Sequence, residues 1–439
     1  MSKVSAISLG CPKNLVDTEI MLGTLRDGGY EFTFNPDEAD VLIINTCAFL
    51  EKARKESMEI IAENIGKYEK LIVAGCLVQL HGEKLLEEFP LIDHLIGVGK
   101  IEEVYQTIVD EKQICLGERL HQHAYSRIIS TLPHTAYVKI ADGCNNCCSY
   151  CLIPALRGKY QSRDMENIIE EVEALVGIGT KEINLIAQDI TLYGFDTHGR
   201  LLLPELLKQL AKISDSLWIR LMYTHPAHVT DELIEIMATT LNICHYLDLP
   251  IQHINDSILG AMNRRVSSQQ IKGLISRLRQ AMPDIALRTS LIVGFPDEGE
   301  DEFLTLLDFV EETRFEHLGA FPYSKESGTP AFNFPNHVDE EVKEERHRRI
   351  MELQKKVSFK KKKEKIGRVL DVIVEGYIEQ GMIGRSQYEA PEIDGVIYLE
   401  DGINIVGAGL APALLIGEIV PVEIIAATEY DLVGRVHKL

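Results

Sequence analysis

The sequence predicts an α/β protein built as an open parallel α/β domain, a partial barrel of βα units and a small all-β barrel. Short apolar runs alternate with amphipathic stretches from residue 3 to about residue 112. The alternation resumes with longer units over residues 135–324. From residue 368 the chain is rich in Val, Ile, Gly and Tyr. A chain of 439 residues exceeds one compact core, so three units are a natural division.

The first unit, residues 1–115, is predicted by continuous apolar strands with helical crossovers. Such strands are typical of a parallel sheet that is covered on both faces. The expected strands cover residues 4–9, 41–44, 71–74 and 94–98. The expected helices cover residues 14–27, 49–65, 78–89 and 101–109.

The second unit, residues 130–360, consists of six βα-like units in which strands alternate with helical patterns. Six such units predict a full or partial βα barrel. The expected strands cover residues 136–140, 182–187, 218–223, 246–249, 287–293 and 318–323. The expected helices cover residues 165–176, 203–213, 231–241, 269–282 and 302–313.

The third unit, residues 363–439, follows a charged helix expected at residues 340–365. Several short strand-like runs predict a small β-barrel. Residues 369–439 hold twelve Asp and Glu against three Lys and Arg, so this unit is markedly acidic.

The overall composition excludes several classes of protein. The content of 45% hydrophobic and 26% charged residues is ordinary for a soluble globular chain. No secretory signal is visible at the amino terminus, so we expect a cytoplasmic protein without a membrane anchor. A net charge of −22 argues against a large basic surface for nucleic acid and favours a basic protein partner. Nine cysteines in such a chain indicate metal binding more than a disulfide framework.

One group of cysteines follows the first predicted barrel strand. Cys144, Cys148 and Cys151 form a C-x3-C-x2-C motif within residues 143–151 (GCNNCCSYC). Three thiolates of one loop can hold three irons of a 4Fe–4S cluster. The fourth iron then stays open to a small molecule, as open catalytic zinc sites do. The motif is typical of enzymes in which S-adenosylmethionine fills that position and yields a 5′-deoxyadenosyl radical.

The metal and the ligand set of this loop each have an alternative interpretation. A structural zinc site with a distant fourth ligand is the competing interpretation, although zinc ligands usually come as two separate C-x2-C pairs. Cys147 could enter the ligand set, but its spacing to Cys151 does not fit the motif, so we take it as a non-ligand. Tyr150 is placed to support the adenine of the cofactor.

A second group of cysteines lies in the first unit. Cys11, Cys47 and Cys76 each follow a predicted parallel strand. The carboxyl ends of parallel strands meet at one edge of a sheet, where ligands bind, so these thiols are expected to converge. Each cysteine taken singly would more often be a small buried residue, which is how we interpret Cys115 and Cys244. Three of them in equivalent places predict a second 4Fe–4S cluster with one open iron.

Two open clusters indicate a conversion of C–H to C–S. One cluster would generate the radical that removes hydrogen from an unactivated carbon. The other would hold a sulfur donor on its free iron and trap the carbon radical. The expected cofactors are therefore two 4Fe–4S clusters and S-adenosylmethionine.

A series of short motifs runs along the chain in a fixed order: residues 8–14 (SLGCPKN), 45–48 (NTCA), 75–77 (GCL), 143–151, 249–253 (LPIQH), 262–265 (MNRR) and 288–296 (RTSLIVGFP). In this set, and over essentially its whole length, the chain resembles the methylthiotransferase family of radical enzymes. The resemblance implies an amino-terminal cluster domain, a radical barrel and a carboxy-terminal TRAM domain. It also implies that Cys11, Cys47 and Cys76 bind the auxiliary cluster and that the other triad binds the radical cluster.

Further motifs are similar to one branch of that family, whose members methylthiolate an aspartate of small-subunit ribosomal protein number twelve. They are residues 153–158 (IPALRG), 188–189, 323–331 (YSKESGTPA) and 384–395 (GRSQYEAPEIDG). The acidic third unit agrees with a basic ribosomal protein as target. Cys147, and residues 297–300 (DEGE), depart from the family pattern and leave details of cofactor binding open.

The remaining candidate contacts to cofactor or substrate lie at predicted strand ends. Gln188 and Asp189 follow the second barrel strand, Gln252 and His253 the fourth, and Gly294 the fifth. His253 could equally be structural. No catalytic residue is assigned.

Two groups of basic residues also have more than one interpretation. Arg288 could neutralise a carboxylate of cofactor or substrate, or form an internal ion pair. The lysines at 360–363 are expected to be solvated, with contact to ribosomal RNA as the alternative.

The leading hypothesis is methylthiolation at the β-carbon of a protein aspartate, with the ribosomal protein as substrate and an electron donor as a further partner. We expect contact with the ribosome, no membrane and no direct tRNA substrate. The nearest alternative is methylthiolation of an adenosine in tRNA. The alternative from another class is a non-catalytic iron–sulfur electron-transfer protein, which would normally complete its clusters with four cysteines.

Overall fold

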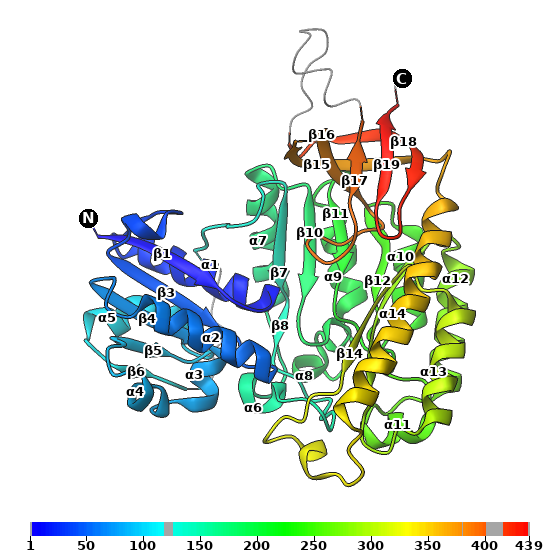
Figure 1. Cartoon of the computed structure of the whole chain (residues 1–439). Coiled ribbons are helices and arrows are strands. Elements are labelled where there is room, and N and C mark those ends of the chain that lie inside the picture. The colour runs from blue at the N-terminus through cyan, green and yellow to red at the C-terminus, as the bar shows by residue number, and fades with distance from the viewer. Residues whose placement is uncertain (1, 118–125, 380, 401–415, 438–439) are drawn as a thin grey trace.

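The chain forms three units that follow one another along the sequence (Figure 1). The structure is a computed structural model and describes residues 2–117, 126–379, 381–400 and 416–437. The central sheet carries the first unit on one side and a small barrel across one of its ends (Figure 1). Among the described residues, no helix is both long and apolar enough to cross a bilayer.

The first unit is a parallel sheet of six strands in the order β2-β1-β3-β4-β5-β6. Its strands are β1 (Lys3–Ser8), β2 (Glu31–Phe32), β3 (Val41–Thr46), β4 (Lys70–Gly75), β5 (His94–Ile96) and β6 (Ile114–Cys115). Its helices are α1 (Pro12–Asp27), α2 (Glu51–Asn64), α3 (Cys76–His81), α4 (Lys84–Glu88) and α5 (Val104–Val109). The predicted parallel α/β fold is confirmed.

Two local details of this unit differ from the sequence prediction. The single helix expected at residues 78–89 is two helices, because Gly82 ends α3 with a φ of +53°. The edge strands β2 and β6, each of two residues, were not predicted. Such short strands lack the run of alternating or apolar residues that marks a longer strand.

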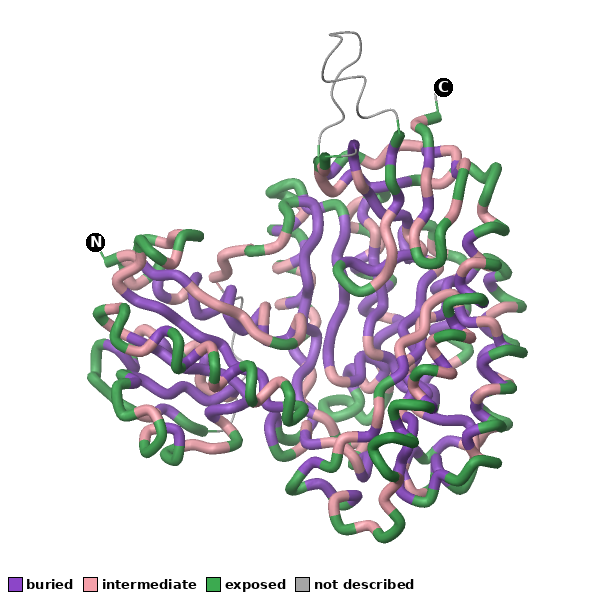
Figure 2. Tube along the Cα trace, in the orientation of Figure 1, coloured by how far each residue is buried: buried purple, intermediate pink, exposed green. Residues whose placement is uncertain are grey.

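The second unit is an open parallel sheet in the order β14-β13-β12-β11-β10-β7, so the barrel is partial. Its strands are β7 (Thr135–Lys139), β10 (Glu182–Ile186), β11 (Trp218–Leu221), β12 (Ile243–Asp248), β13 (Ala286–Val293) and β14 (His317–Pro322). The helices that follow these strands or extend from them are α6 (Ile153–Arg157), α7 (Met165–Gly177), α8 (Phe195–His198), α9 (Leu203–Leu210), α10 (Asp231–Thr239), α11 (Asp256–Ala261), α12 (Ser268–Ala281), α13 (Glu300–Thr313) and α14 (Glu340–Lys363). The central strands of both large sheets are mostly buried, whereas many exposed residues lie on the outer helices and loops (Figure 2).

The third unit is a closed barrel in the order β15-β16-β17-β19-β18. Its strands are β15 (Val369–Ile378), β16 (Gly381–Ser386), β17 (Ile397–Leu399), β18 (Ile419–Ala427) and β19 (Leu432–Val436). The small β-barrel that the sequence predicted is therefore present.

The segment 384–395 of the third unit closes the amino-terminal end of the partial barrel. Arg385 binds Glu182 at the start of β10 with an N–O distance of 2.6 Å. Asp394 accepts a hydrogen bond from Tyr246 of β12 at 2.8 Å and lies 3.5 Å from the Arg288 guanidinium of β13. The contacts join barrel strands near the end opposite to the one where such folds place their chemistry. The motif at residues 384–395 thus binds the small barrel of the third unit to the strands of the central sheet.

Candidate functional site

Three cysteines lie together at one edge of the first sheet. β1, β3 and β4 are parallel neighbours, so their carboxyl ends share that edge. Cys11 directly precedes α1, Cys47 follows β3, and Cys76 is the first residue of α3. The structure brings these three predicted residues together in the way that parallel strand ends require.

Asn14 ties the ends of these strands to one another. Its side-chain nitrogen donates to the carbonyl oxygens of Leu9 and Thr46, each at 2.9 Å. Its side-chain oxygen lies 3.8 Å from the Sγ atom of Cys76. The amide therefore holds the loops that carry all three thiols in one arrangement.

Gly10 allows Cys47 to approach the loop after β1. Its φ is +91°, and a Cβ atom built there would lie 2.7 Å from Cys47 Cβ and 2.8 Å from its Sγ atom. Only glycine adopts this conformation without strain and leaves room for the thiol. The glycine of this motif therefore belongs to the cysteine site.

The three thiols have different protonation tendencies. Burial raises the pKa of Cys76 to about 11, against the influence of Arg157. Burial also raises the pKa of Cys47. For Cys11 burial acts in the same direction, but the positive charges of Lys13 and Arg157 outweigh it and leave the pKa below its ordinary value. Metal ions deprotonate such thiols on binding, and two nearby cations suit the negative charge that results.

The second cysteine loop is closed at its base by a two-stranded hairpin. β8 (Ala141–Asp142) pairs with β9 (Gln161–Ser162), and the Cys144 amide donates to the carbonyl of Gly158 at 3.2 Å. A Cβ atom at Gly143 would lie 2.1 Å from a backbone oxygen on the opposite side, so glycine is needed for this closure.

Cys147 is set apart from the other cysteines of this loop. It is exposed, and its φ is +52°, whereas Cys148 is 9% exposed. Its carbonyl oxygen accepts a hydrogen bond from the Asn263 side chain at 2.9 Å. The different orientation supports the exclusion of Cys147 from the ligand set.

Each cysteine group offers three thiols, a donor set that fits a 4Fe–4S cluster with one open iron. Zn–S bonds of about 2.3 Å place the sulfurs of one ion about 4 Å apart. Among the described residues, the only three ligand atoms found within 4.8 Å of one another belong to Asp189, His225 and His228. Neither cysteine group forms such a compact ligand set among the described residues. Burial raises the pKa of Cys144 to about 11 and that of Cys151 to about 12, so these thiols are neutral until metal binds.

Arg264 lies against the second cysteine loop, and sequence analysis did not select it individually. One of its terminal nitrogens lies 3.6 Å from the Sγ atom of Cys148, and the other donates to the Pro250 carbonyl at 2.5 Å. Its Nε atom is buried, has no hydrogen-bond partner among the described residues, and no carboxylate there pairs with the guanidinium. The signal for it was its place in the motif at residues 262–265.

A buried network of charges connects the two cysteine loops. Arg157 at the end of α6 binds Asp17 of α1 at 3.0 Å and Asp142 at 2.9 Å. Lys139 of β7 binds the same two carboxylates. Arg157 also donates to the Asn14 side chain. Asn14 and Asp17, which lie beside the triad of Cys11, thus contact the base of the loop that carries Cys144.

Gln188 and Asp189 lie beside this network, as the strand-end prediction requires. The Gln188 side chain donates to Asp142 at 2.8 Å, while its oxygen is buried without a partner among the described residues. Asp189 accepts hydrogen bonds from Asn146 of the cysteine loop at 2.8 Å and from the Thr191 amide at 3.0 Å. The unpartnered Gln188 oxygen is an acceptor available to a bound amine or hydroxyl.

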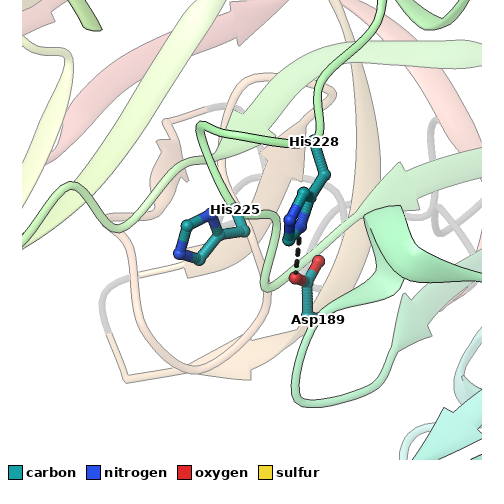
Figure 3. Close-up of side chains that lie close together, drawn as sticks. All are labelled: Asp189, His225 and His228. Atoms are coloured by element: carbon teal, nitrogen blue, oxygen red, sulfur yellow. Dashed lines mark hydrogen bonds and ion pairs between the residues drawn. The ribbon is translucent and has the colours of Figure 1, made fainter. Parts of the chain in front are cut away.

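Two histidines that the sequence prediction missed complete this side of the site (Figure 3). His228 lies 2.9 Å from an Asp189 oxygen, and the rings of His225 and His228 stack at 4.8 Å. Burial lowers the pKa of His225 to about 3, so this ring is neutral. Burial raises the pKa of Asp189, but the hydrogen bonds from His228 and Thr191 contribute to a net decrease. The signal in the sequence was a pair of histidines after the third barrel strand.

Gln252 and His253 are held by backbone contacts after β12. Gln252 has a φ of +71°, and its amide donates to the Ser290 carbonyl at 2.9 Å. His253 is fully buried, accepts a hydrogen bond from the Asn255 amide at 3.0 Å, and lies 3.6 Å from Glu298. These contacts account for His253 as a structural residue, and its contact with a cofactor stays a prediction.

Arg288 and Gly294 also have partners inside the protein. Arg288 lies 3.4 Å from Asp248 and 3.5 Å from Asp394, which is the internal ion pair that the sequence left open. Gly294 has a φ of +72°, and its amide donates to Glu298 at 2.9 Å.

Tyr150 is partly buried and packs against an apolar cluster that includes Phe295 and Tyr323. It lies directly before Cys151, at the cysteine loop. Its contact with adenine stays a prediction.

Three family models match the chain in order. Residues 3–97 match a family described as uncharacterized protein family UPF0004, residues 138–310 match the radical SAM superfamily, and residues 366–436 match the TRAM domain. Among solved structures, the radical S-adenosylmethionine methyltransferase TsrM from Kitasatospora setae is similar with a TM-score of 0.59 and 15% identity, over 75% of this chain and 77% of that one. This likeness shows the fold alone.

Curated relatives match nearly the whole chain. A protein of Geobacter sulfurreducens named ribosomal protein uS12 methylthiotransferase RimO is 46% identical over 99% of this chain and 98% of its own length. Proteins with the same name from Pelotomaculum thermopropionicum and Clostridioides difficile are each 44% identical over 99% of both chains.

Proposed function

The chain belongs to the RimO family of radical S-adenosylmethionine methylthiotransferases, and we propose that it adds a methylthio group to the β-carbon of an aspartate in ribosomal protein uS12. It is an enzyme of the transferase class that uses S-adenosylmethionine and two 4Fe–4S clusters. The observation that carries the proposal is the pair of cysteine triads, which follow strands of two parallel sheets and are joined by the buried charges around Arg157.

The six cysteines are assigned to the two clusters. Cys11, Cys47 and Cys76 would hold the auxiliary cluster, and Cys144, Cys148 and Cys151 the radical cluster. The network around Arg157 supports this division because it contacts both loops and supplies positive charge beside the thiolates. When bound, the clusters and S-adenosylmethionine supply the electron, the radical, the sulfur site and the methyl group.

Several residues of the chain can hold S-adenosylmethionine at the radical cluster. Arg264 is buried beside Cys148 without a carboxylate partner among the described residues, which suits the methionyl carboxylate. The open oxygen of Gln188 suits the methionyl amine. Tyr150, Gln252 and the backbone near Gly294 remain the proposed surroundings of the adenosyl group.

The domains then have separate tasks. Residues 1–115 would carry the auxiliary cluster, residues 130–360 the radical chemistry, and residues 363–439 the TRAM barrel. Segment 384–395 is a plug at the opposite end of the barrel, so it contributes stability and does not contact the reacting atoms. We therefore propose that this motif, which is similar to the RimO branch, serves to close the barrel.

A protein target is favoured over RNA by charge. The chain carries a net charge of −22, and residues 369–439 hold twelve acidic against three basic residues. Like charges oppose a nucleic-acid phosphate backbone and attract a basic ribosomal protein. Contact with the assembled ribosome, an external electron donor and a cytoplasmic location belong to the same proposal. Adenosine in tRNA and non-catalytic electron transfer are not favoured.

Mass spectrometry of uS12 tests the proposed reaction. A strain without this gene should lose the methylthio group from the target aspartate, and a plasmid copy should restore it. Nucleoside analysis of tRNA from the same strain is the control. An unchanged uS12 mass, or loss of a methylthio-adenosine, would overturn the proposal.

Iron analysis tests the two triads separately. The anaerobically reconstituted protein should hold about eight irons, and serine in place of either triad should reduce this to about four. Cys244 is buried outside both triads, and C244A should leave the iron content unchanged. The assignment fails if one triple variant keeps all of its iron.

A further inference from the structure

Lys13 is a buried cation at the boundary between the first unit and the barrel. It lies in the first turn of α1, two residues after Cys11, and is 7% exposed. Its ammonium nitrogen lies 3.2 Å from the ring centroid of Tyr223, which follows β11. The segment after β11, at the end of the barrel where such folds carry out their chemistry, therefore contacts this lysine.

The Tyr223 ring is held in place by an unusual backbone. Tyr223 has a φ of +61°, a conformation that bulky residues rarely adopt. Its amide donates to the Asp248 carboxylate at 3.0 Å. Strained backbone of this kind is typical of functional sites, where the surrounding structure enforces it. Here it places an aromatic face against the ammonium group.

Lys13 faces the thiol of Cys11, but among the described residues it forms no ion pair with a carboxylate, unlike its buried neighbours. Lys139 and Arg157 each pair with Asp17 and Asp142. The thiol of Cys11 is the group that attracts the Lys13 ammonium most, and Asp248 is a carboxylate that also attracts it. Asp248, however, pairs with Arg288 and not with the lysine. A buried ammonium group is costly unless an anion pairs with it, and an aromatic face compensates only in part. The position is suited to an anion that arrives from outside the chain.

The position of Lys13 indicates which anion this is. The site must receive two carboxylates, one from S-adenosylmethionine and one from the substrate aspartate. Arg264 lies against Cys148 of the radical triad, whereas Lys13 lies next to Cys11 of the auxiliary triad. The cofactor carboxylate belongs at the radical cluster. Lys13 is left for the carboxylate of the substrate.

We propose that Lys13 binds the side-chain carboxylate of the target aspartate and so selects aspartate as the residue to be modified. This inference rests on the proposed function. The reacting β-carbon is bonded directly to the carboxylate carbon, so a cation that holds the carboxylate also holds the carbon between the two clusters. Positioning of this kind is a large contribution to catalysis.

The test uses the reconstituted full-length enzyme and purified uS12 that carries either the target aspartate or asparagine in its place. The variants are K13M, which keeps the length of the side chain without its charge, and K13R, which keeps the charge. K52M is the control, since Lys52 is an exposed lysine of the same unit. Product is measured by mass spectrometry, and KM is measured for both uS12 and S-adenosylmethionine.

We expect the wild type to prefer aspartate over asparagine by roughly 10- to 100-fold in kcat/KM, the range for a hydrogen bond to a charged group. K13M should raise the KM for uS12 by a similar factor and abolish the preference. K13R should restore part of the preference, and K52M should match the wild type. The KM for S-adenosylmethionine and the iron content should not change.

Other outcomes distinguish a failure of the proposed function from a failure of the role of Lys13. If the wild type modifies neither form of uS12, the proposed function fails. If the wild type modifies uS12 but accepts asparagine equally well, or if K13M keeps the preference, the role of Lys13 alone is overturned. Loss of auxiliary-cluster iron in K13M would also overturn it, because the lysine would then stabilise the cluster. The wild-type comparison does not depend on the folding of any variant.

Discussion

Arg157 donates to Asp17 at 3.0 Å, and both side chains are almost completely buried. Arg157 ends the short helix that follows the radical triad, and Asp17 lies in the helix that follows Cys11. One ion pair thus joins the segments that present the two cysteine triads. This contact links the two cysteine loops directly.

R157M should lower the free energy of unfolding by about 3–5 kcal/mol, because it leaves Asp17 and Asp142 with one cation between them in a buried site. Urea denaturation followed by circular dichroism measures the change. Arg348 forms ion pairs only on the exposed face of α14, and R348A should cost less than about 1 kcal/mol. Equal effects of the two variants would contradict the structural role of the buried pair.

G10A should remove the auxiliary cluster and leave the radical cluster in place. The new methyl group would lie 2.7 Å from Cys47 Cβ, so the thiol has to move. Iron content should fall to about half, with four of about eight irons left. Gly29 has a similar φ of +95° with nothing within 4 Å, so G29A gives the backbone strain without the clash. A G10A protein with full iron content would refute the assignment of Cys47.

R264M should raise the KM for S-adenosylmethionine roughly 10- to 100-fold, because a charged hydrogen bond to the methionyl carboxylate is lost. R264K should restore part of the affinity. The neighbouring Arg265 is exposed, and R265M should behave like the wild type. Formation of 5′-deoxyadenosine at varied cofactor concentration is the measurement. An unchanged KM would remove Arg264 from the cofactor site.

The junction between the TRAM barrel and the central sheet should be sensitive to acid. Burial alone raises the pKa of Glu182, but Arg385 and Arg220 outweigh it and hold the pKa well below its ordinary value of 4.5. The stabilisation by this carboxylate is therefore complete above about pH 4.5 and is lost as the pH falls towards the folded-state pKa. The melting temperature of the wild type should decrease below that pH.

E182Q provides the comparison for this pH dependence. Removal of the charge leaves two buried arginines without their shared partner and should cost about 3–5 kcal/mol at neutral pH. Its melting temperature should also decrease less steeply with acid, because the titrating group is gone. Parallel curves for E182Q and the wild type would show that another group controls the acid sensitivity.

Most of the fold was predictable because strand and helix patterns are local. The apolar runs before Cys11, Cys47 and Cys76 identified parallel strands, and the shared edge of such strands placed the thiols together. The spacing of Cys144, Cys148 and Cys151 likewise depends on one short loop. The helix at residues 78–89 was mispredicted because a single residue, Gly82, ends it by a backbone conformation that periodicity does not reveal.

The role of segment 384–395 was not predictable from its residues. As a motif it marked a branch of the family, and its acidic surroundings favoured a protein target. In the structure Arg385 and Asp394 bind strands of the central barrel, so the motif closes the fold. The partners lie far apart in sequence, and only packing shows which of them meet.

The sequence by itself determined the three units, the two cysteine triads and thereby the reaction class, since these depend on short-range patterns and on strand ends. The tertiary structure alone decided which charges face the site. It paired Arg157 with Asp17, brought His225 and His228 to Asp189, and placed Lys13 over the ring of Tyr223. The physical reason is that pairing between buried charges depends on distances between segments that are remote along the chain.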